Sequence, residues 1–211
     1  MICNRHIYGI ILNDKAELVR LAPSFAEKPY LAPPVAPVIF MKPATALTGG
    51  TVGVKPGEQV VAAATLALLI ARDTTRVDAE HAMDCVGATA LAIDISYPQV
   101  NYYRPAIAQR NADGFLVLGE WGWPTVPDAI TTTIDDQPGH RWSLDRLARP
   151  IPQLIADISA YLTLQAGDVL MVGLPGDAPV VRAGVALCAQ APGLGAATAR
   201  IETGRIEELV Q

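Results

Sequence analysis

The feature that most constrains the fold of this chain is an uninterrupted apolar run at residues 60–71, VVAAATLALLIA. A helix that spans a membrane needs roughly 20 consecutive apolar residues, so this run is too short to be one. Gly57 precedes the run, and Arg72 and Asp73 end it. A short apolar run with such boundaries is either a buried strand or a buried helix. We predict a buried strand, because the segments around it also have the composition of strands.

The composition predicts a single domain over residues 1–211. Of the 211 residues, 51% are hydrophobic and 18% are charged, which is enough apolar material for one large core. The first ten residues lack the long apolar stretch of a secretory signal, so we expect a cytoplasmic protein without a membrane partner. The net charge is −5 and no run of lysine and arginine exceeds a pair, which argues against nucleic acid as a partner. Cys3, Cys85 and Cys188 are widely spaced, so we expect reduced thiols.

Short apolar segments separated by turn residues predict a chain built mostly of strands. The expected strands are residues 7–12, 38–42, 60–71, 88–96, 114–121, 129–135, 167–174, 184–191 and 197–203, the last two as a hairpin. Residues 47–58 are rich in glycine and are typical of a loop or a hairpin.

Helices are expected at only two places. Asp78 is a candidate cap for a short helix at residues 79–86, and an amphipathic pattern predicts a longer helix that begins near Arg149. Five prolines between Pro23 and Pro37 predict an extended connection that cannot be helical. Since strands and helices do not alternate, the predicted class is α+β and mostly β, a roll and not a doubly wound sheet.

The stretch richest in chemically active side chains is NYYRPAIAQRNADGF, residues 101–115. It contains two tyrosines, Arg104, Arg110 and Asp113. Guanidinium groups bind carboxylates through two parallel hydrogen bonds, so the stretch favours carboxylate recognition. A surface pair of arginines beside loop aromatics fits the same residues. The three histidines are too scattered to form a zinc site by local spacing.

Five segments together resemble the fumarylacetoacetate hydrolase family: VIFMKPATALTGG, VGATALAIDIS, NYYRPAIAQRNADGF, LQAGDVLMVGLP and GLGAATARIE. The resemblance covers nearly the whole chain. It is closest to the N-terminal half of the branch that isomerises and decarboxylates intermediates of 4-hydroxyphenylacetate degradation. It implies a mixed β-roll with a few flanking helices. It also implies a Mg²⁺ or Mn²⁺ ion that is held by a Glu-x-Glu pair and a later Asp, and that chelates a 2-oxo acid.

The metal site implied by this resemblance is incomplete in the sequence. Asp94 falls at the position of the later Asp, but the two glutamates fall at Ala63 and Thr65 and are lost. Mg²⁺ gives up its water reluctantly and needs anionic ligands, so a lone Asp94 predicts weak binding at best. A purely structural role for Asp94 fits the sequence as well. In the family's lid segment, Asn13 is present and Glu17 is available, but the family's His is missing.

The resemblance also implies roles for six other residues. The candidate catalytic residues are Lys42, Arg110 and Asp113, and the candidate substrate-binding residues are Tyr103, Arg104 and Gly173. Cations placed near a developing enolate oxygen stabilise it even without a metal, which is the role expected of Lys42 and Arg110.

The resemblance implies an enzyme subunit that acts on a small dicarboxylate or tricarboxylate, and the cations Lys42, Arg104 and Arg110 have the charge that such a substrate needs. The expected reaction is decarboxylation of 5-oxopent-3-ene-1,2,5-tricarboxylate, isomerisation of 2-hydroxyhepta-2,4-dienedioate, or both. Two alternatives remain open: a non-catalytic partner of a sister chain that keeps the Glu-x-Glu pair, and an acylpyruvate hydrolase. The resemblance further implies a homo-oligomer, or a hetero-oligomer with a homologous subunit.

Overall fold

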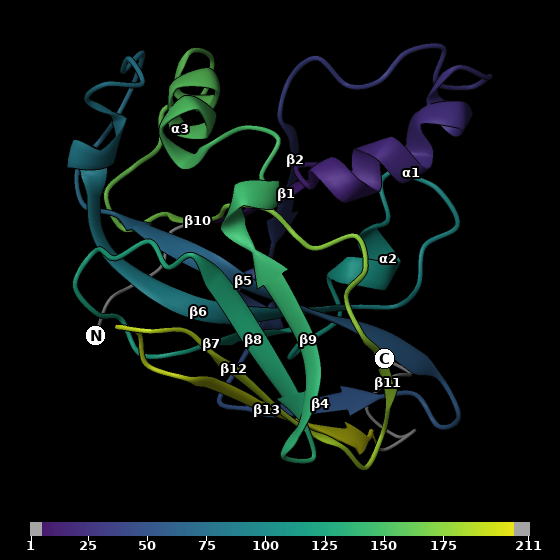
Figure 1. The fold of residues 1–211 in the computed structure, drawn as a ribbon. Helices are drawn as coiled ribbons and strands as arrows, with labels where there is room; N and C mark the ends of the chain where they lie inside the picture. The colour runs from purple at the N-terminus through teal and green to yellow at the C-terminus, as the bar shows by residue number, and fades with distance from the viewer. Residues whose placement is uncertain (1–5, 205–211) are drawn as a thin grey trace.

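The computed structural model describes residues 6–204, and strands dominate this part of the chain (Figure 1). Cys3 lies outside the described residues. The α-helices of the described part are α1 (Lys15–Phe25), α2 (Ile107–Arg110) and α3 (Ile151–Ser159). The strands are β1 (Ile7–Ile11), β2 (Val38–Lys42), β3 (Leu47–Thr48), β4 (Thr51–Val54), β5 (Gln59–Ile70), β6 (Val86–Ser96), β7 (Leu116–Leu118), β8 (Ala129–Ile134), β9 (Gln137–Ser143), β10 (Val169–Met171), β11 (Val180–Arg182), β12 (Ala186–Gln190) and β13 (Ala197–Thr203).

The strands form two mixed sheets, one of which curls into a roll. The larger sheet has the order β2-β1-β10-β5-β6-β7-β3, and β11 pairs with the start of β5. Its two end strands, β2 and β3, are separated in the chain only by residues 43–46, so the sheet turns back toward itself. The second sheet has the order β4-β13-β12-β8-β9. The predicted class, α+β and mostly β with a mixed roll, is confirmed.

The long strands β5 and β6 are buried on both faces, which explains the apolar run. One face carries Leu66 and Leu68 of β5 and packs into the main core with Ile130 of the second sheet and Leu154 of α3. The other face lies inside the curl. It belongs to a smaller buried cluster of Ile7, Ala46, Ala67, Ala92, Leu116, Val169 and Met171. Three of these seven residues are alanines, because the interior of a tightly curled sheet leaves little room for side chains.

Several sequence predictions are confirmed in detail. The apolar run is strand β5, and β12 and β13 pair as an antiparallel hairpin. The amphipathic helix is α3, which begins at Ile151 directly after Pro150. No helix in the described part of the chain is long and apolar enough to cross a membrane.

Three predictions about local structure were wrong. Pro23 lies inside α1, near its end, where a missing N–H costs one hydrogen bond without breaking the helix. The helix expected at residues 79–86 is only a 3₁₀ turn at residues 82–85, and Asp78 accepts from the His81 N–H just before it. Residues 47–58, expected as a loop or a hairpin, contain two short strands that do not pair with each other, because β3 pairs with β7 and β4 pairs with β13 of the other sheet.

Candidate functional site

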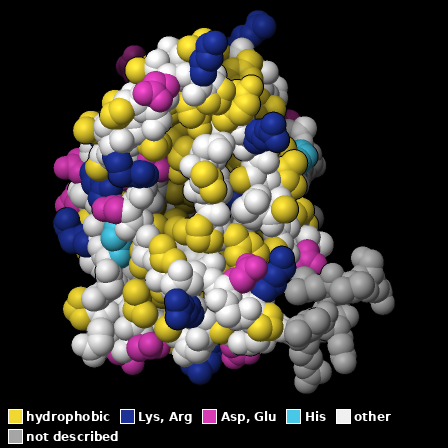
Figure 2. All heavy atoms as spheres, turned by 90° about the vertical axis from the view of Figure 1, so that its right-hand side faces the viewer, with side chains coloured by type: hydrophobic (Ala, Val, Ile, Leu, Met, Phe, Trp, Pro, Cys, Tyr) yellow, Lys and Arg dark blue, Asp and Glu magenta, His cyan; other side chains and the backbone are white. Residues whose placement is uncertain are grey.

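A cavity of about 210 Å³ lies between α1, the end of β6 and the connection from β10 to β11. Helices α1 and α2 both lie on this side of the roll (Figure 1). The face that carries them is hollowed near its centre, with hydrophobic side chains around the hollow (Figure 2). The polar side chains that line the cavity are Glu17, Arg20, Asp94, Ser96, Tyr97, Gln99, Tyr102 and Arg110.

Asp94 is the buried anion of this site, and two cations contact it. Its side chain is 1% exposed; Oδ2 accepts from Nη1 of Arg110 at 3.1 Å, and Oδ1 lies 2.9 Å from Nζ of Lys42. The three protons of Lys42 are directed to main-chain carbonyls, those of Ile95 and Phe115 at 2.9 Å each and that of Arg110. Burial lowers the pKa of Lys42, and the charge of Asp94 opposes that shift.

The guanidinium of Arg110 is held in one orientation by three groups. It pairs with Asp94, and it lies over the ring of Phe40 at 4.7 Å from the ring centroid. With its amide oriented to satisfy both groups, Gln99 accepts from Nε and Nη2 of Arg110 at 2.6 and 2.8 Å. A planar cation fixed in this way is preorganised to bind an oxyanion or a carboxylate.

Glu17 places a second carboxyl group in the same cavity. It is 4% exposed although it lies in the first turn of α1, and Tyr102 donates to its Oε1 at 2.6 Å. Burial raises the pKa of Glu17, while the hydrogen bond from Tyr102 and the charge of Arg20 act against that increase. Burial and the adjacent Glu17 raise the pKa of Tyr102, which keeps the phenol protonated as a donor. Glu17 therefore has the environment of a proton donor and acceptor.

The mouth of the cavity is held together by the buried carboxylate of Asp14. Asp14 caps α1 by accepting from the Ala16 N–H at 3.0 Å, and its Oδ2 accepts from the Gly176 N–H at 2.9 Å. Arg146 donates to both oxygens of Asp14 and also to Asp177. The helix that carries Glu17 and the loop that faces it are thus fixed to one group. Gly176 must lack a side chain, because a Cβ there would lie 2.4 Å from Cβ of Glu17.

The side chains at this site do not suit a divalent metal. Ala63 lies beside Asp94 in the sheet register, and the Thr65 hydroxyl donates to the Gly173 carbonyl at 2.5 Å. Within residues 6–204 there is no group of three or more His, Cys, Asp or Glu side chains placed to hold an ion. The carboxylate of Asp94 already contacts two cations, so a metal ion there would meet two fixed positive charges.

The structure brings together only some of the predicted site residues. Asp94 and Arg110 share the cavity, whereas Lys42 lies behind Asp94 and does not line it. Tyr103 and Arg104 line a neighbouring hollow of about 350 Å³. Gly173 does not line the cavity, although the next residue, Leu174, does.

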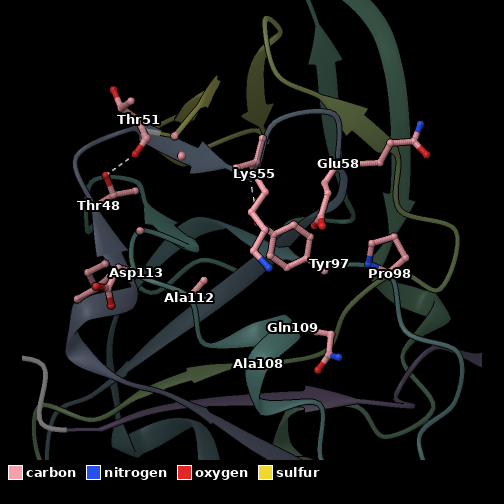
Figure 3. Close-up of a pocket in the computed structure, with 16 residues that line it drawn as sticks. Thr48, Thr51, Lys55, Glu58, Tyr97, Pro98, Ala108, Gln109, Ala112 and Asp113 are labelled. Carbon is pink, nitrogen blue, oxygen red and sulfur yellow. Dashed lines mark hydrogen bonds between the residues drawn. The ribbon is translucent and has the colours of Figure 1, made fainter. Parts of the chain in front are cut away.

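Asp113 lies farther away, in a hollow of about 970 Å³ that also contains Lys55 and Tyr97 (Figure 3). This larger hollow shares the wall residues Tyr97 and Pro98 with the cavity, but Glu17, Asp94 and Arg110 do not line it. Its Lys55 ammonium lies over the Tyr97 ring, at 5.6 Å from the centroid. The structure therefore does not place Asp113 with Arg110 and Asp94.

Sequence reasoning missed Arg20 and the role of Tyr102, and it named Glu17 only as an available lid residue. Glu17 and Arg20 are one turn apart on α1, where Nη2 of Arg20 lies 3.5 Å from Oε1 of Glu17. An acidic and a basic residue at this spacing are a signal for a helix face, but the segment was not recognised as a helix.

Comparison with known proteins settles the family. A model of the fumarylacetoacetate (FAA) hydrolase C-terminal domain matches residues 6–202. The chain belongs to the fumarylacetoacetate hydrolase family. The resemblance found in the sequence is confirmed by this match.

Two curated relatives of this family member share one description. The 4-hydroxyphenylacetate degradation bifunctional isomerase/decarboxylase of Escherichia coli is 34% identical over 173 residues, which are 80% of this chain and 40% of that protein. The protein of the same description from Salmonella dublin is 32% identical over 194 residues, 90% of this chain and 45% of that protein. The chain thus spans less than half the length of these relatives.

A solved structure supports the fold of this family member. Fumarylpyruvate hydrolase from Pseudomonas aeruginosa, in complex with Mn²⁺ and pyruvate, superposes with a TM-score of 0.79 at 20% identity, over 95% of this chain and 91% of that chain. At this identity the likeness shows the fold alone.

Proposed function

We propose that this family member acts on small 2-oxo or 2-hydroxy dicarboxylates or tricarboxylates of 4-hydroxyphenylacetate catabolism, by decarboxylation, isomerisation or both. The descriptions of its two relatives support this substrate class. The observation that carries the proposal is the cavity itself, in which the buried carboxyl of Glu17 shares one space with the fixed guanidinium of Arg110.

Both reactions pass through the same kind of anion. When CO₂ leaves the tricarboxylate, the electron pair of the broken C–C bond is delocalised through the double bond onto the oxo oxygen, which then takes up a proton to give the 2-hydroxy diene. Isomerisation of the resulting 2-hydroxy diene removes the hydroxyl proton and adds a proton at C5, which restores the 2-oxo group. A cation beside the 2-oxo oxygen stabilises the negative charge in both steps.

The residues of the cavity supply these two needs. Arg110 binds the oxygen that carries the enolate charge, and its orientation is fixed by Asp94 and Gln99. Glu17 moves the proton, because burial raises its pKa and keeps the acid form available at higher pH. Arg20 lies at the rim and binds a substrate carboxylate. No step in this scheme is assigned to a metal ion, since the donor set does not suit one.

The remaining candidates have other places in the scheme. Lys42 has a structural place, because its protons are engaged by the main chain and only its charge lies beside Asp94. Tyr103 and Arg104 flank the neighbouring hollow. The scheme assigns no role to Asp113 or Gly173.

The proposal is tested by two variants and two assays. CO₂ release measures decarboxylation, and loss of the diene absorbance measures isomerisation. Glu17→Gln should lower isomerisation by about 10²–10⁴-fold, the usual contribution of a general acid or base, and lower CO₂ release less. Arg110→Met should lower both. The matched control is Glu58→Gln, because Glu58 is exposed and lines the 970 Å³ hollow but not the cavity. Wild-type rates in both cavity variants would refute the proposal.

A second candidate function is a non-catalytic partner subunit, and the neutral residues Ala63 and Thr65 favour it. In that case the purified chain would be inactive, and activity would appear only with a sister chain that carries the Glu-x-Glu pair. That activity would be indifferent to Glu17→Gln, which separates this candidate from the first. Hydrolysis of an acylpyruvate in the same assays would identify the third alternative.

A further inference from the structure

A second hollow adjoins the cavity and has a different character. Its volume is about 350 Å³, and it shares four wall residues with the cavity. Its own walls are mostly apolar and include Phe40, Met41, Pro105 and Ile107. Ile107 is 65% exposed and Met41 is 48% exposed, so apolar side chains stand open to any molecule that enters.

The wall between the two spaces includes Arg110, the residue proposed to bind the reacting end of the substrate. The shared residues are Ile11, Gln99, Tyr102 and Arg110. The guanidinium of Arg110 pairs with Asp94 on the cavity side and covers Phe40, which lines the second hollow. A chain whose oxygen-rich head is bound by Arg110 therefore has an apolar surface directly beside it.

The two spaces suit different parts of a linear substrate. The cavity carries the polar groups that bind an oxygen-rich head, and the second hollow lies next to it with apolar walls. A seven-carbon dioate whose head is bound by Arg110 can extend its far end along those walls. The second hollow offers that end one cation: Arg104, which has no ion-pair partner among residues 6–204.

We infer that the second hollow is a tail subsite, which takes the flat apolar middle of a linear dioate and pairs its distal carboxylate with Arg104. The protein then selects dioates long enough to span both spaces over four-carbon diacids. This inference rests on the proposed function only for the statement of which end of the substrate reacts. Each methylene that enters an apolar groove improves binding, so selectivity grows with chain length.

Calorimetric binding of unreactive diacids to the full chain tests the inference. Succinate, adipate and pimelate differ only in the number of methylenes, and heptanoate lacks the distal carboxylate. We expect pimelate to bind at least about tenfold more tightly than succinate, a fraction of the gain from three fully buried methylenes. Arg104→Met should reduce pimelate binding to the level of heptanoate and leave succinate unchanged. Arg182→Met, a change of an exposed arginine on β11, is the control and should alter neither.

A second variant keeps the test decisive if Arg104 tolerates no change. Ile107→Asp places a negative charge at the rim of the hollow and should weaken pimelate at least about tenfold without weakening succinate. Equal binding of succinate and pimelate, or equal losses for both in either variant, would overturn the inference. If binding depends on the length of the diacid but no turnover is found, the proposed function is refuted and the tail subsite stands. If turnover is found but binding does not depend on length, the tail subsite is refuted and the proposed function stands.

Discussion

Replacing Asp94 by Asn should destabilise the chain strongly, because it removes the only carboxylate that contacts Lys42 and Arg110 within the described residues. The side chains of Lys42, Asp94 and Arg110 are 0%, 1% and 9% exposed, so water cannot replace the lost charge. Removing one partner of a buried ion pair typically costs about 3–5 kcal/mol. For a chain of this length, 1 kcal/mol lowers Tm by about 2–4 °C, so the expected decrease is about 6–20 °C.

Urea unfolding at several pH values measures this loss and its cause. Burial already lowers the pKa of Lys42, and Asp94 opposes that shift, so Asp94→Asn lowers the pKa further. The folded variant then binds fewer protons than the unfolded chain, and its stability rises as the pH rises through the lowered pKa toward 10.5. The penalty should therefore shrink at alkaline pH.

The control for this experiment is the same substitution in a more exposed pair. Asp157 lies 3.1 Å from Nε of Arg149, and its side chain is 31% exposed. Asp157→Asn should cost less than about 1 kcal/mol. If Asp94→Asn costs no more than Asp157→Asn and shows no alkaline recovery, the reasoning about buried charge at this site is refuted.

Three further outcomes are expected. Burial raises the pKa of Glu17, so the folded chain binds this proton more tightly than the unfolded chain, and stability falls as pH rises from 4.5 through the raised pKa. In Glu17→Gln, urea unfolding should no longer show this decrease in the free energy of unfolding with rising pH. An unchanged pH dependence of stability would contradict the assignment to Glu17. Calorimetric titration should give a Kd for Mg²⁺ in the millimolar range or weaker, because the carboxylate of Asp94 is already paired with two cations. A micromolar Kd at a 1:1 ratio would contradict this expectation and indicate further ligands. Arg146→Ala should raise KM several-fold, because it releases α1 and the Gly176 loop from their shared contact. Arg146→Lys keeps the positive charge and should raise KM less. An unchanged KM in Arg146→Ala would show that Asp14 holds the mouth of the cavity without Arg146.

Most strands could be predicted from the sequence. A strand that is buried on both faces is a continuous apolar run, and a strand that is buried on one face alternates apolar with polar residues. Helix α1 could not be, because its buried side chains are only Glu17 and Phe25 and it has no apolar stripe. The prolines from Pro23 onward also suggested an extended segment, although Pro23 is accommodated near the helix end.

Single residues of the candidate site could be predicted, because the family resemblance names their positions. Pairs of residues that come together only in the folded chain could not. The resemblance names Asp94 as a metal position and Arg110 as a catalytic residue, and the structure joins these two side chains as a buried ion pair. The pair of Glu17 and Tyr102 is 85 residues apart in the chain, so no local spacing reveals it. Lys42 is a lysine at the position that the family resemblance names, but the sequence does not show that its ammonium group donates to main-chain carbonyls.

Lys42 acts on the fold in the way a covalent cross-link would. One ammonium group joins the end of β2 to main-chain oxygens 53, 68 and 73 residues further along the chain. A scan that replaces every lysine would find Lys42 essential for activity, because without it the roll would no longer be held closed. Only a readout of structure, such as protection of the β6 amides from hydrogen exchange, distinguishes a residue that holds the roll closed from one that touches the substrate.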